Sequence, residues 1–178
     1  MKIRFKTESK TLYELGDLWG NFLRNKRNNF VFGHIKGKLL DISCGDNLLV
    51  KKYGNGTGVD IIPFSDDVIV VQSVDKLPFE NNTFDTVTNV AALNYANNPQ
   101  KSLIEMKRVL TRNGIILISM PNYYALRIWR LFRREDIIFK AIKRKKLKKL
   151  IYKAGLRVIM EKRFLLGLNV LYIINKNS

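Results

Sequence analysis

The chain has 178 residues with one cysteine, Cys44, and one histidine, His34, so we expect neither an internal disulfide nor a metal site. A formal net charge of +17 favours anionic partners. No segment approaches the roughly 18 apolar residues of a membrane span, and the first ten residues lack the apolar run of a signal peptide. These observations predict one domain over residues 1–178 and a cytoplasmic location.

The N-terminal region, residues 1–37, is predicted to form a helical cap. From Thr11 to Lys26, leucines and aromatic residues recur at helical spacing, and Thr11 is a candidate N-cap. The helix is expected either to close over a ligand as a lid or to pack on a sheet. Asn28–Lys36 is predicted to be a loop.

The next stretch has the pattern of a nucleotide-binding βαβ unit. It contains a buried strand, a flexible loop, a short helix and a second strand: Leu39–Ile42, Ser43–Asn47, Leu48–Tyr53 and Thr57–Val59. The second strand ends at Asp60, which lies 19 residues after Asp41. An acid at about 20 residues can accept two hydrogen bonds from a ribose diol.

The connection after Asp60 is unusually short. Residues 61–67 separate it from an expected strand at Val68–Gln72. A parallel crossover usually takes a dozen or more residues with a helix, so we expect this helix to be missing or reduced to a turn. Gly54–Gly58 precedes a strand and is therefore interpreted as a turn, not as a phosphate loop.

Further elements follow in alternating order. They are a strand at Thr86–Val90, a helix at Pro99–Leu110 that stops at Thr111–Gly114, a strand at Ile115–Met120, helices at Ala125–Arg134 and Lys140–Lys153, and closing strands at Leu156–Leu165 and Leu168–Asn175. The last two strands are expected to form a hairpin around Leu166 and Gly167.

The positive charge is concentrated near the C-terminus, in residues 123–178. Between Arg127 and Arg163 there are 15 Lys and Arg residues against three acids. Such a segment can contact an anionic membrane surface or nucleic-acid phosphate, or it can be a solvated helix face over the core.

Four ordered blocks within residues 38–122 resemble the class I S-adenosylmethionine (SAM)-dependent methyltransferases, of the compact type-11-like kind. Asp41, Ser43, Gly45 and Asn47 stand at the acid and the three glycines of motif I, of which only the middle glycine is present. The other blocks are Leu77-Pro78-Phe79 with Phe84-Asp85, then Glu105, Arg108-Val109-Leu110 and Asn113-Gly114, and finally Pro121-Asn122.

This resemblance implies an α/β, Rossmann-like three-layer sandwich with a mostly parallel seven-stranded sheet whose last strand is antiparallel. It implies SAM as the cofactor. The expected cofactor contacts are Asp41 and the backbone of Ser43, Cys44 and Gly45 at the methionine end, Asp60 and Ile61 at the ribose, Ser73 and Val74 at the adenine, and Asn89 and Val90 as further contacts. Asn94 and Tyr95 are candidates to line the acceptor, and Tyr95 is equally expected as a core aromatic.

The predicted reaction is methyl transfer from SAM to an anionic or membrane-associated small molecule, lipid or sugar. Transfer from a sulfonium needs mainly alignment, so the lack of an obvious acid–base pair does not count against catalysis. RNA methylation is one alternative. The other is a catalytically silent SAM-fold module that binds an anionic partner through its basic face.

Overall fold

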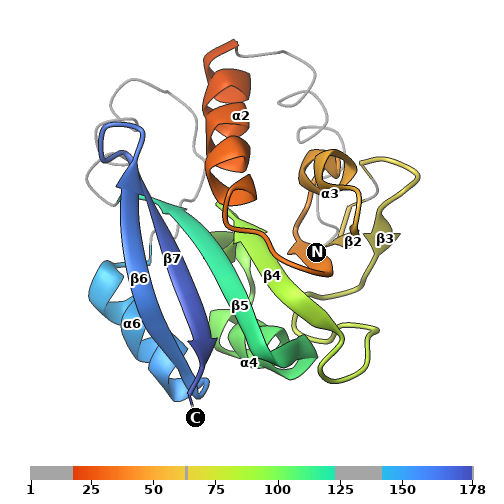
Figure 1. The fold of residues 1–178 in the computed structure, drawn as a ribbon, viewed down its shortest axis with the longest axis vertical. Coiled ribbons are helices and arrows are strands. Elements are labelled where there is room, and N and C mark those ends of the chain that lie inside the picture. Colours follow the sequence, from red (N-terminus) through yellow and green to blue (C-terminus); the bar gives the residue numbers. More distant parts are fainter. Residues whose placement is uncertain (1–17, 63, 123–141, 178) are drawn as a thin grey trace, which may run out of the picture.

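The computed structural model describes residues 18–62, 64–122 and 142–177. In these residues seven strands form one sheet in the order β3-β2-β1-β4-β5-β7-β6 (Figure 1). Their bounds are β1 Leu39–Ile42, β2 Gly56–Asp60, β3 Ile69–Val70, β4 Phe84–Val90, β5 Leu110–Pro121, β6 Leu156–Phe164 and β7 Asn169–Lys176.

The pairing confirms the mostly parallel sheet with an antiparallel last strand. The pairs β3–β2, β2–β1, β1–β4 and β4–β5 are parallel, whereas β7 runs antiparallel to both β5 and β6. All four residues of β1 are buried. Continuous burial is expected for a parallel strand covered on both faces, and it explains why Leu39–Ile42 is an apolar run interrupted only by Asp41.

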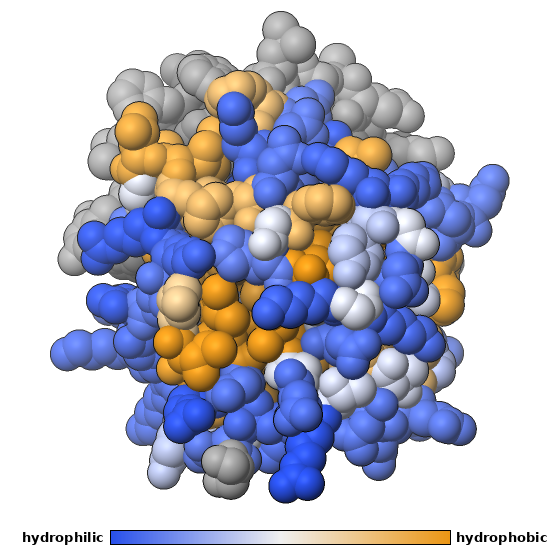
Figure 2. Space-filling model, viewed as in Figure 1, coloured by the Kyte–Doolittle hydropathy of each residue, from blue (hydrophilic) through white to orange (hydrophobic). Residues whose placement is uncertain are grey.

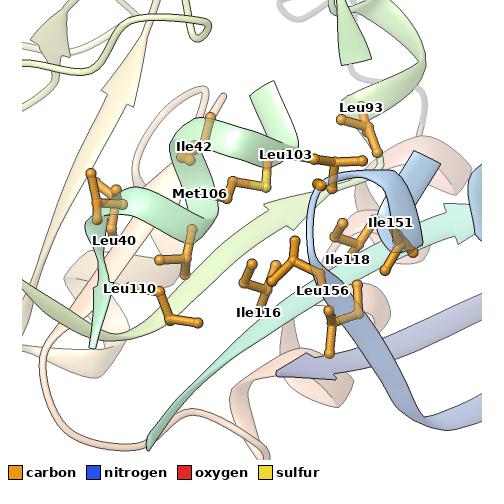
Figure 3. Close-up of a cluster of buried hydrophobic side chains, with 14 of the residues drawn as sticks. Leu40, Ile42, Leu93, Leu103, Met106, Leu110, Ile116, Ile118, Ile151 and Leu156 are labelled. Atoms are coloured by element: carbon orange, nitrogen blue, oxygen red, sulfur yellow. The ribbon is translucent and has the colours of Figure 1, made fainter. Parts of the chain in front are cut away.

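Helices cover both faces of the sheet, which makes three layers (Figure 1). The helices are α2 Leu18–Phe32, α3 Leu48–Tyr53, α4 Pro99–Val109 and α6 Arg144–Lys153, with a short 3-10 helix, η1, at Leu93–Tyr95. Neighbouring strand residues point to opposite faces. Leu40 therefore packs in the core with α4 and α6 (Figure 3), while Leu39 packs in a second core with α2 and α3.

Two boundary predictions are wrong. Asn28–Lys36 was predicted as a loop, but α2 continues to Phe32 because Val31 is fully buried and the Phe30 ring stacks on Phe164 with centroids 4.3 Å apart. The predicted stop at Thr111–Gly114 is part of β5, because α4 leads directly into that strand at Leu110.

The short connection between β2 and β3 is confirmed for the residues that the structure describes there, since no helix lies between Asp60 and Ile69. β3 has two residues, fewer than predicted. The first part of the expected helix at Thr11–Lys26, and all of the expected helix at Ala125–Arg134, lie outside the described residues.

Helix α4 holds the loop that precedes β4. Glu105 accepts a 2.9 Å hydrogen bond from the backbone N–H of Leu77. The Arg108 guanidinium donates to the carbonyl of Phe79 at 2.7 Å and to that of Leu77 at 3.0 Å. It also pairs with Glu105 at 2.8 Å, and this pairing lowers the pKa of the Glu105 carboxyl. Two of the sequence blocks described above are therefore in direct contact.

We expect Arg108→Lys to destabilise the fold by about 2 kcal/mol, because an ammonium cannot reproduce the planar fork that reaches several acceptors at once. Urea unfolding measures the change. Arg112→Lys, on the exposed part of β5, is the matched control and should leave the unfolding midpoint unchanged. Equal midpoints for both variants would contradict the role given to Arg108.

Candidate functional site

The loop between β1 and α3 keeps a glycine-like backbone with a single glycine. Ser43, Gly45 and Asn47 have φ values of 59°, 58° and 63°, all in the left-handed region. This conformation costs an L-residue roughly 1–2 kcal/mol, less for Asn, so it persists because the surroundings hold it. The N–H groups of Ser43 and Cys44 donate to the Val59 carbonyl at 2.8 and 3.2 Å, which fixes the loop against β2.

Asn47 is accommodated by a glycine that the sequence analysis had interpreted only as part of a turn. Its side-chain amide donates to the Asp67 carboxylate at 2.7 Å, and the residue is 2% exposed. A Cβ at Gly58 would collide with the Asn47 amide oxygen and would lie 2.8 Å from the Cys44 sulfur. Gly58 is therefore needed because Asn47 occupies the space above it.

Asp60 joins the end of β2 to this loop. One carboxylate oxygen accepts a 2.9 Å hydrogen bond from the Gly45 N–H, and the other accepts from the N–H groups of Ile61 at 2.7 Å and Ile62 at 3.3 Å. Asp60 is 6% exposed, while the Ile61 side chain is exposed. A buried carboxylate is thus held at the carboxyl edge of the sheet, directly beside the loop backbone.

A second acid, Asp41, lies within β1 beneath the loop. Burial raises the pKa of its carboxyl to about 7, partly offset by a 2.6 Å hydrogen bond from the Thr88 hydroxyl, while Asp60 and Asp46 raise it further. Burial, together with the charges of Asp41 and Asp60, also raises the pKa of the Cys44 thiol. Cys44 is therefore a protonated thiol at neutral pH and a poor nucleophile.

The predicted adenine residues lie in the loop after β3. The Ser73 hydroxyl accepts a 3.1 Å hydrogen bond from the Asp75 N–H, and Val74 packs against the α4–α6 core. Asp75 in turn accepts a 2.6 Å hydrogen bond from Ser102 of α4. The loop is thereby fixed, and it follows β3 at the same edge of the sheet as Asp60.

The remaining predicted residues lie at the end of β4 and just beyond it. Asn89 donates a 3.2 Å hydrogen bond to the Ile42 carbonyl, its own amide oxygen is buried without a hydrogen-bond partner, and Val90 is half-buried. Asn94 is buried and accepts from the Ile142 N–H at 3.3 Å, whereas the Tyr95 side chain is 54% exposed and so lies outside the core.

A cavity of about 620 Å³, which the sequence analysis did not anticipate, lies between the end of β5, the start of α6 and the β6–β7 pair. Its charged lining is Lys143, Arg144, Lys145, Glu161 and Arg163. Burial alone would raise the pKa of Glu161, but its hydrogen bonds with Lys148 and Arg144 lower it. Among the described residues this lining has four basic side chains and one acid, so its described part is positive.

Among the described residues, no group of three or more His, Cys, Asp and Glu side chains could hold a metal ion. Among the helices described, none has the length and apolar character needed to cross a bilayer.

Residues 40–118, which contain the loop, Asp60 and all of β4, match the family model of a methyltransferase domain. This stretch is therefore similar to a methyltransferase domain. An uncharacterized Methanocaldococcus jannaschii protein, MJ1252, is 32% identical over 98 residues, which are 50% of this chain but only 39% of that protein.

Solved structures of methyltransferases share the fold of this chain. A methyltransferase complexed with the Haloferax volcanii Trm112 methyltransferase activator has a TM-score of 0.74 and 15% identity, covering 91% of this chain and 95% of that one. A SAM-dependent methyltransferase from Clostridium acetobutylicum has a TM-score of 0.71 and 13% identity, covering 94% and 100%. These likenesses show the fold that the chain shares with both proteins.

The raised pKa of Asp41 makes stability depend on pH. Its ordinary pKa is 3.8 and its folded value is about 7, so the folded state binds more protons, and this carboxyl lowers stability progressively as pH rises from about 4 to about 7. Asp41→Asn keeps an acceptor for Thr88 and removes the charge. We expect its advantage in free energy of unfolding over the natural chain to grow by about 3 kcal/mol between pH 4 and 8.

Urea unfolding at a series of pH values tests this expectation. Asp66→Asn, at an exposed position of the neighbouring loop, is the control and should differ from the natural chain by a constant amount. If the curves of Asp41→Asn and the natural chain were parallel, the buried carboxyl would not be the source of the dependence.

Proposed function

We propose that this chain transfers the methyl group of SAM to an anionic small-molecule or lipid acceptor. The observation that carries the proposal is the contact between Asp60 and the Gly45 N–H, which brings a buried carboxylate and a left-handed loop backbone together at one edge of the sheet. A ribose diol can donate to such a carboxylate, and a loop without bulky side chains lets a ligand approach its backbone.

The residues present fit SAM at each part of the proposed site. Asp60 offers its carboxylate to the ribose hydroxyls. The oxygen that accepts from the Gly45 N–H keeps a further lone pair, whereas the other accepts from the N–H groups of Ile61 and Ile62, and a ribose hydroxyl would have to replace the longer, 3.3 Å bond from Ile62. In this proposal the Ser43–Gly45 backbone faces the methionine end, and Asp41, ionised once the pH exceeds its pKa of about 7, favours positive charge there. Ser73 offers a hydroxyl and Val74 its backbone to the adenine edge.

When bound, SAM supplies a methyl group that its sulfonium already activates. The chain's task is then to hold the acceptor atom in line and to keep water away, and orientation of this kind supplies most of the acceleration. Tyr95, exposed beside the end of β4, is placed to line the acceptor. Asn94 acts by positioning, because its side chain ties η1 to the segment that leads into α6.

The positive cavity beside β5 supports an anionic acceptor. Its charged lining has four basic groups and one acid, and that acid already binds Arg144 and Lys148. The first turn of α6 has no acidic residue and begins Arg144-Lys145-Lys146, although the positive end of a helix disfavours cations. A carboxylate or phosphate in the cavity would relieve this repulsion.

Asp60→Ala should weaken SAM binding about 100-fold, because two charge-assisted hydrogen bonds to the ribose are lost. Calorimetric titration with SAM and with its demethylated product measures the change, and circular dichroism checks that the variant folds. Asp66→Asn is the matched control and should bind as the natural chain does. Unchanged affinity in Asp60→Ala would refute the placement of the ribose, and no binding by the natural chain would favour a silent module.

The double variant Lys145→Gln, Arg163→Gln should have a kcat/KM about tenfold lower for acceptors that carry phosphate or carboxylate. The reason is that the variant loses two charged donors, and hydrogen bonds from charged donors to such anions are strong. Rates for neutral analogues and the affinity for SAM should not change. Lys149→Gln, exposed on α6 outside the cavity, is the control. An equal loss for charged and neutral acceptors would contradict the proposal, and activity on RNA that falls steeply with salt would favour the nucleic-acid alternative.

A further inference from the structure

The turn between β6 and β7 has an unusual sequence for its backbone. Leu165, Leu166 and Gly167 have φ values of 51°, 54° and 81°, so three consecutive residues are left-handed. Phe164 pairs with Asn169, so four residues connect the strands. Left-handed turn positions favour Gly, Asn and Asp, because branched apolar side chains are strained there. Leucine at two of these positions is therefore not explained by the needs of the turn.

The strained turn is held firmly by hydrogen bonds. The Gly167 N–H donates to the Phe164 carbonyl at 3.2 Å, and the Leu168 N–H donates to the Leu165 carbonyl at 3.0 Å. Asn122, just beyond β5, adds two more: its N–H donates to the Leu168 carbonyl at 2.7 Å and its side-chain amide to the Gly167 carbonyl at 3.1 Å. The tip is thus fixed in one conformation from a neighbouring strand.

Fixing the tip presents apolar side chains to solvent. Leu166 is completely exposed and Leu168 is 43% exposed. Leu165, by contrast, packs against the α2–α3 core, next to Phe164. The hairpin projects past the end of β5 in Figure 1, and Figure 2 shows apolar surface in the same upper-left region with hydrophilic surface beneath it.

Basic side chains line the cavity next to the base of the tip. Asn122, which binds the turn, lines the same cavity as Lys143, Lys145 and Arg163. The one acid in that lining, Glu161, is bound by Arg144 and Lys148. An apolar projection next to a basic cavity is complementary to a bilayer with anionic headgroups, whose interior takes apolar side chains and whose surface attracts Lys and Arg.

We propose that the Leu166–Leu168 tip inserts into an anionic lipid bilayer, with Lys143, Lys145 and Arg163 at the headgroups. A few apolar side chains and cations give reversible, peripheral binding, since each cation near the surface adds only about fivefold in affinity. This contact places the cavity and the carboxyl edge of the sheet at the membrane surface. It is independent of whether the domain transfers a methyl group.

Leu166→Asn separates membrane binding from folding. Asparagine tolerates the left-handed conformation better than leucine does, so the variant should unfold at the same or a higher temperature. It removes the fully exposed apolar side chain, so we expect its partition onto vesicles to fall at least about tenfold. If Leu166 served only to build the hairpin, its replacement would not weaken vesicle binding while leaving the unfolding temperature unchanged or higher.

The measurement is co-sedimentation of the full chain with vesicles of phosphatidylcholine alone, or with a quarter of phosphatidylserine, at low and high salt. The natural chain should bind the anionic vesicles and lose most of that binding on neutral vesicles or at high salt. Ile159→Thr is the matched control, because it removes a 48% exposed apolar side chain of β6 away from the tip, and it should bind as the natural chain does.

Three results would overturn the inference. They are absence of binding by the natural chain at low salt, equal binding by Leu166→Asn, and an equal loss in Ile159→Thr. The first would assign the tip to a protein partner, and the third would show that general surface hydrophobicity drives adsorption.

Discussion

The carboxylate of Asp60 is the contact on which the candidate site depends. It accepts backbone N–H groups from both sides, one from the loop after β1 and two from the residues that follow β2. Parallel strands bring their carboxyl ends to the same edge, but they do not by themselves fix the loops beyond that edge. A buried acid that bonds to two of these segments holds them at a defined separation.

The loop shows how a glycine motif can lose glycines and keep its shape. Ser43 and Asn47 retain left-handed backbone angles, and the strain this causes is offset by hydrogen bonds from the Ser43 and Cys44 N–H groups to β2 and from the Asn47 amide to Asp67. The backbone path that matters for a ligand is thus specified by contacts outside the loop. A count of the motif glycines alone therefore does not show whether a loop keeps the backbone shape that a ligand needs.

Much of the fold could be predicted from the sequence because local signals agree with it. The bounds predicted for β1 and α3 are those observed, and the hairpin formed by β6 and β7 turns at Leu166 and Gly167 as expected. The errors arise where distant contacts decide. Stacking of Phe30 on Phe164, far apart in sequence, extends α2, and the need of Leu110 to be buried removes the loop between α4 and β5.

For the site, the sequence indicated which residues meet at one edge but not how they are held. The sequence spacing of 19 residues between Asp41 and Asp60 predicted that Asp60 is the ribose-binding acid at the end of β2. The backbone N–H groups that donate to Asp60 could not be predicted in this way, because they depend on the loop conformation. The positive cavity could not be predicted, since its lining comes from β5, α6, β6 and β7, and no spacing in the sequence relates these segments.

The contact between Asn47 and Gly58 also has a consequence for the order in which the sequence can change. While Asn47 is present, any side chain at position 58 collides with its amide, so that position is closed to substitution. Replacement of Asn47 by glycine would remove the nearest of these contacts and keep the left-handed backbone, but the Cys44 sulfur would still lie 2.8 Å from a Cβ at position 58. A side chain at position 58 is therefore accessible only after a change at position 47 and a shift or replacement of Cys44.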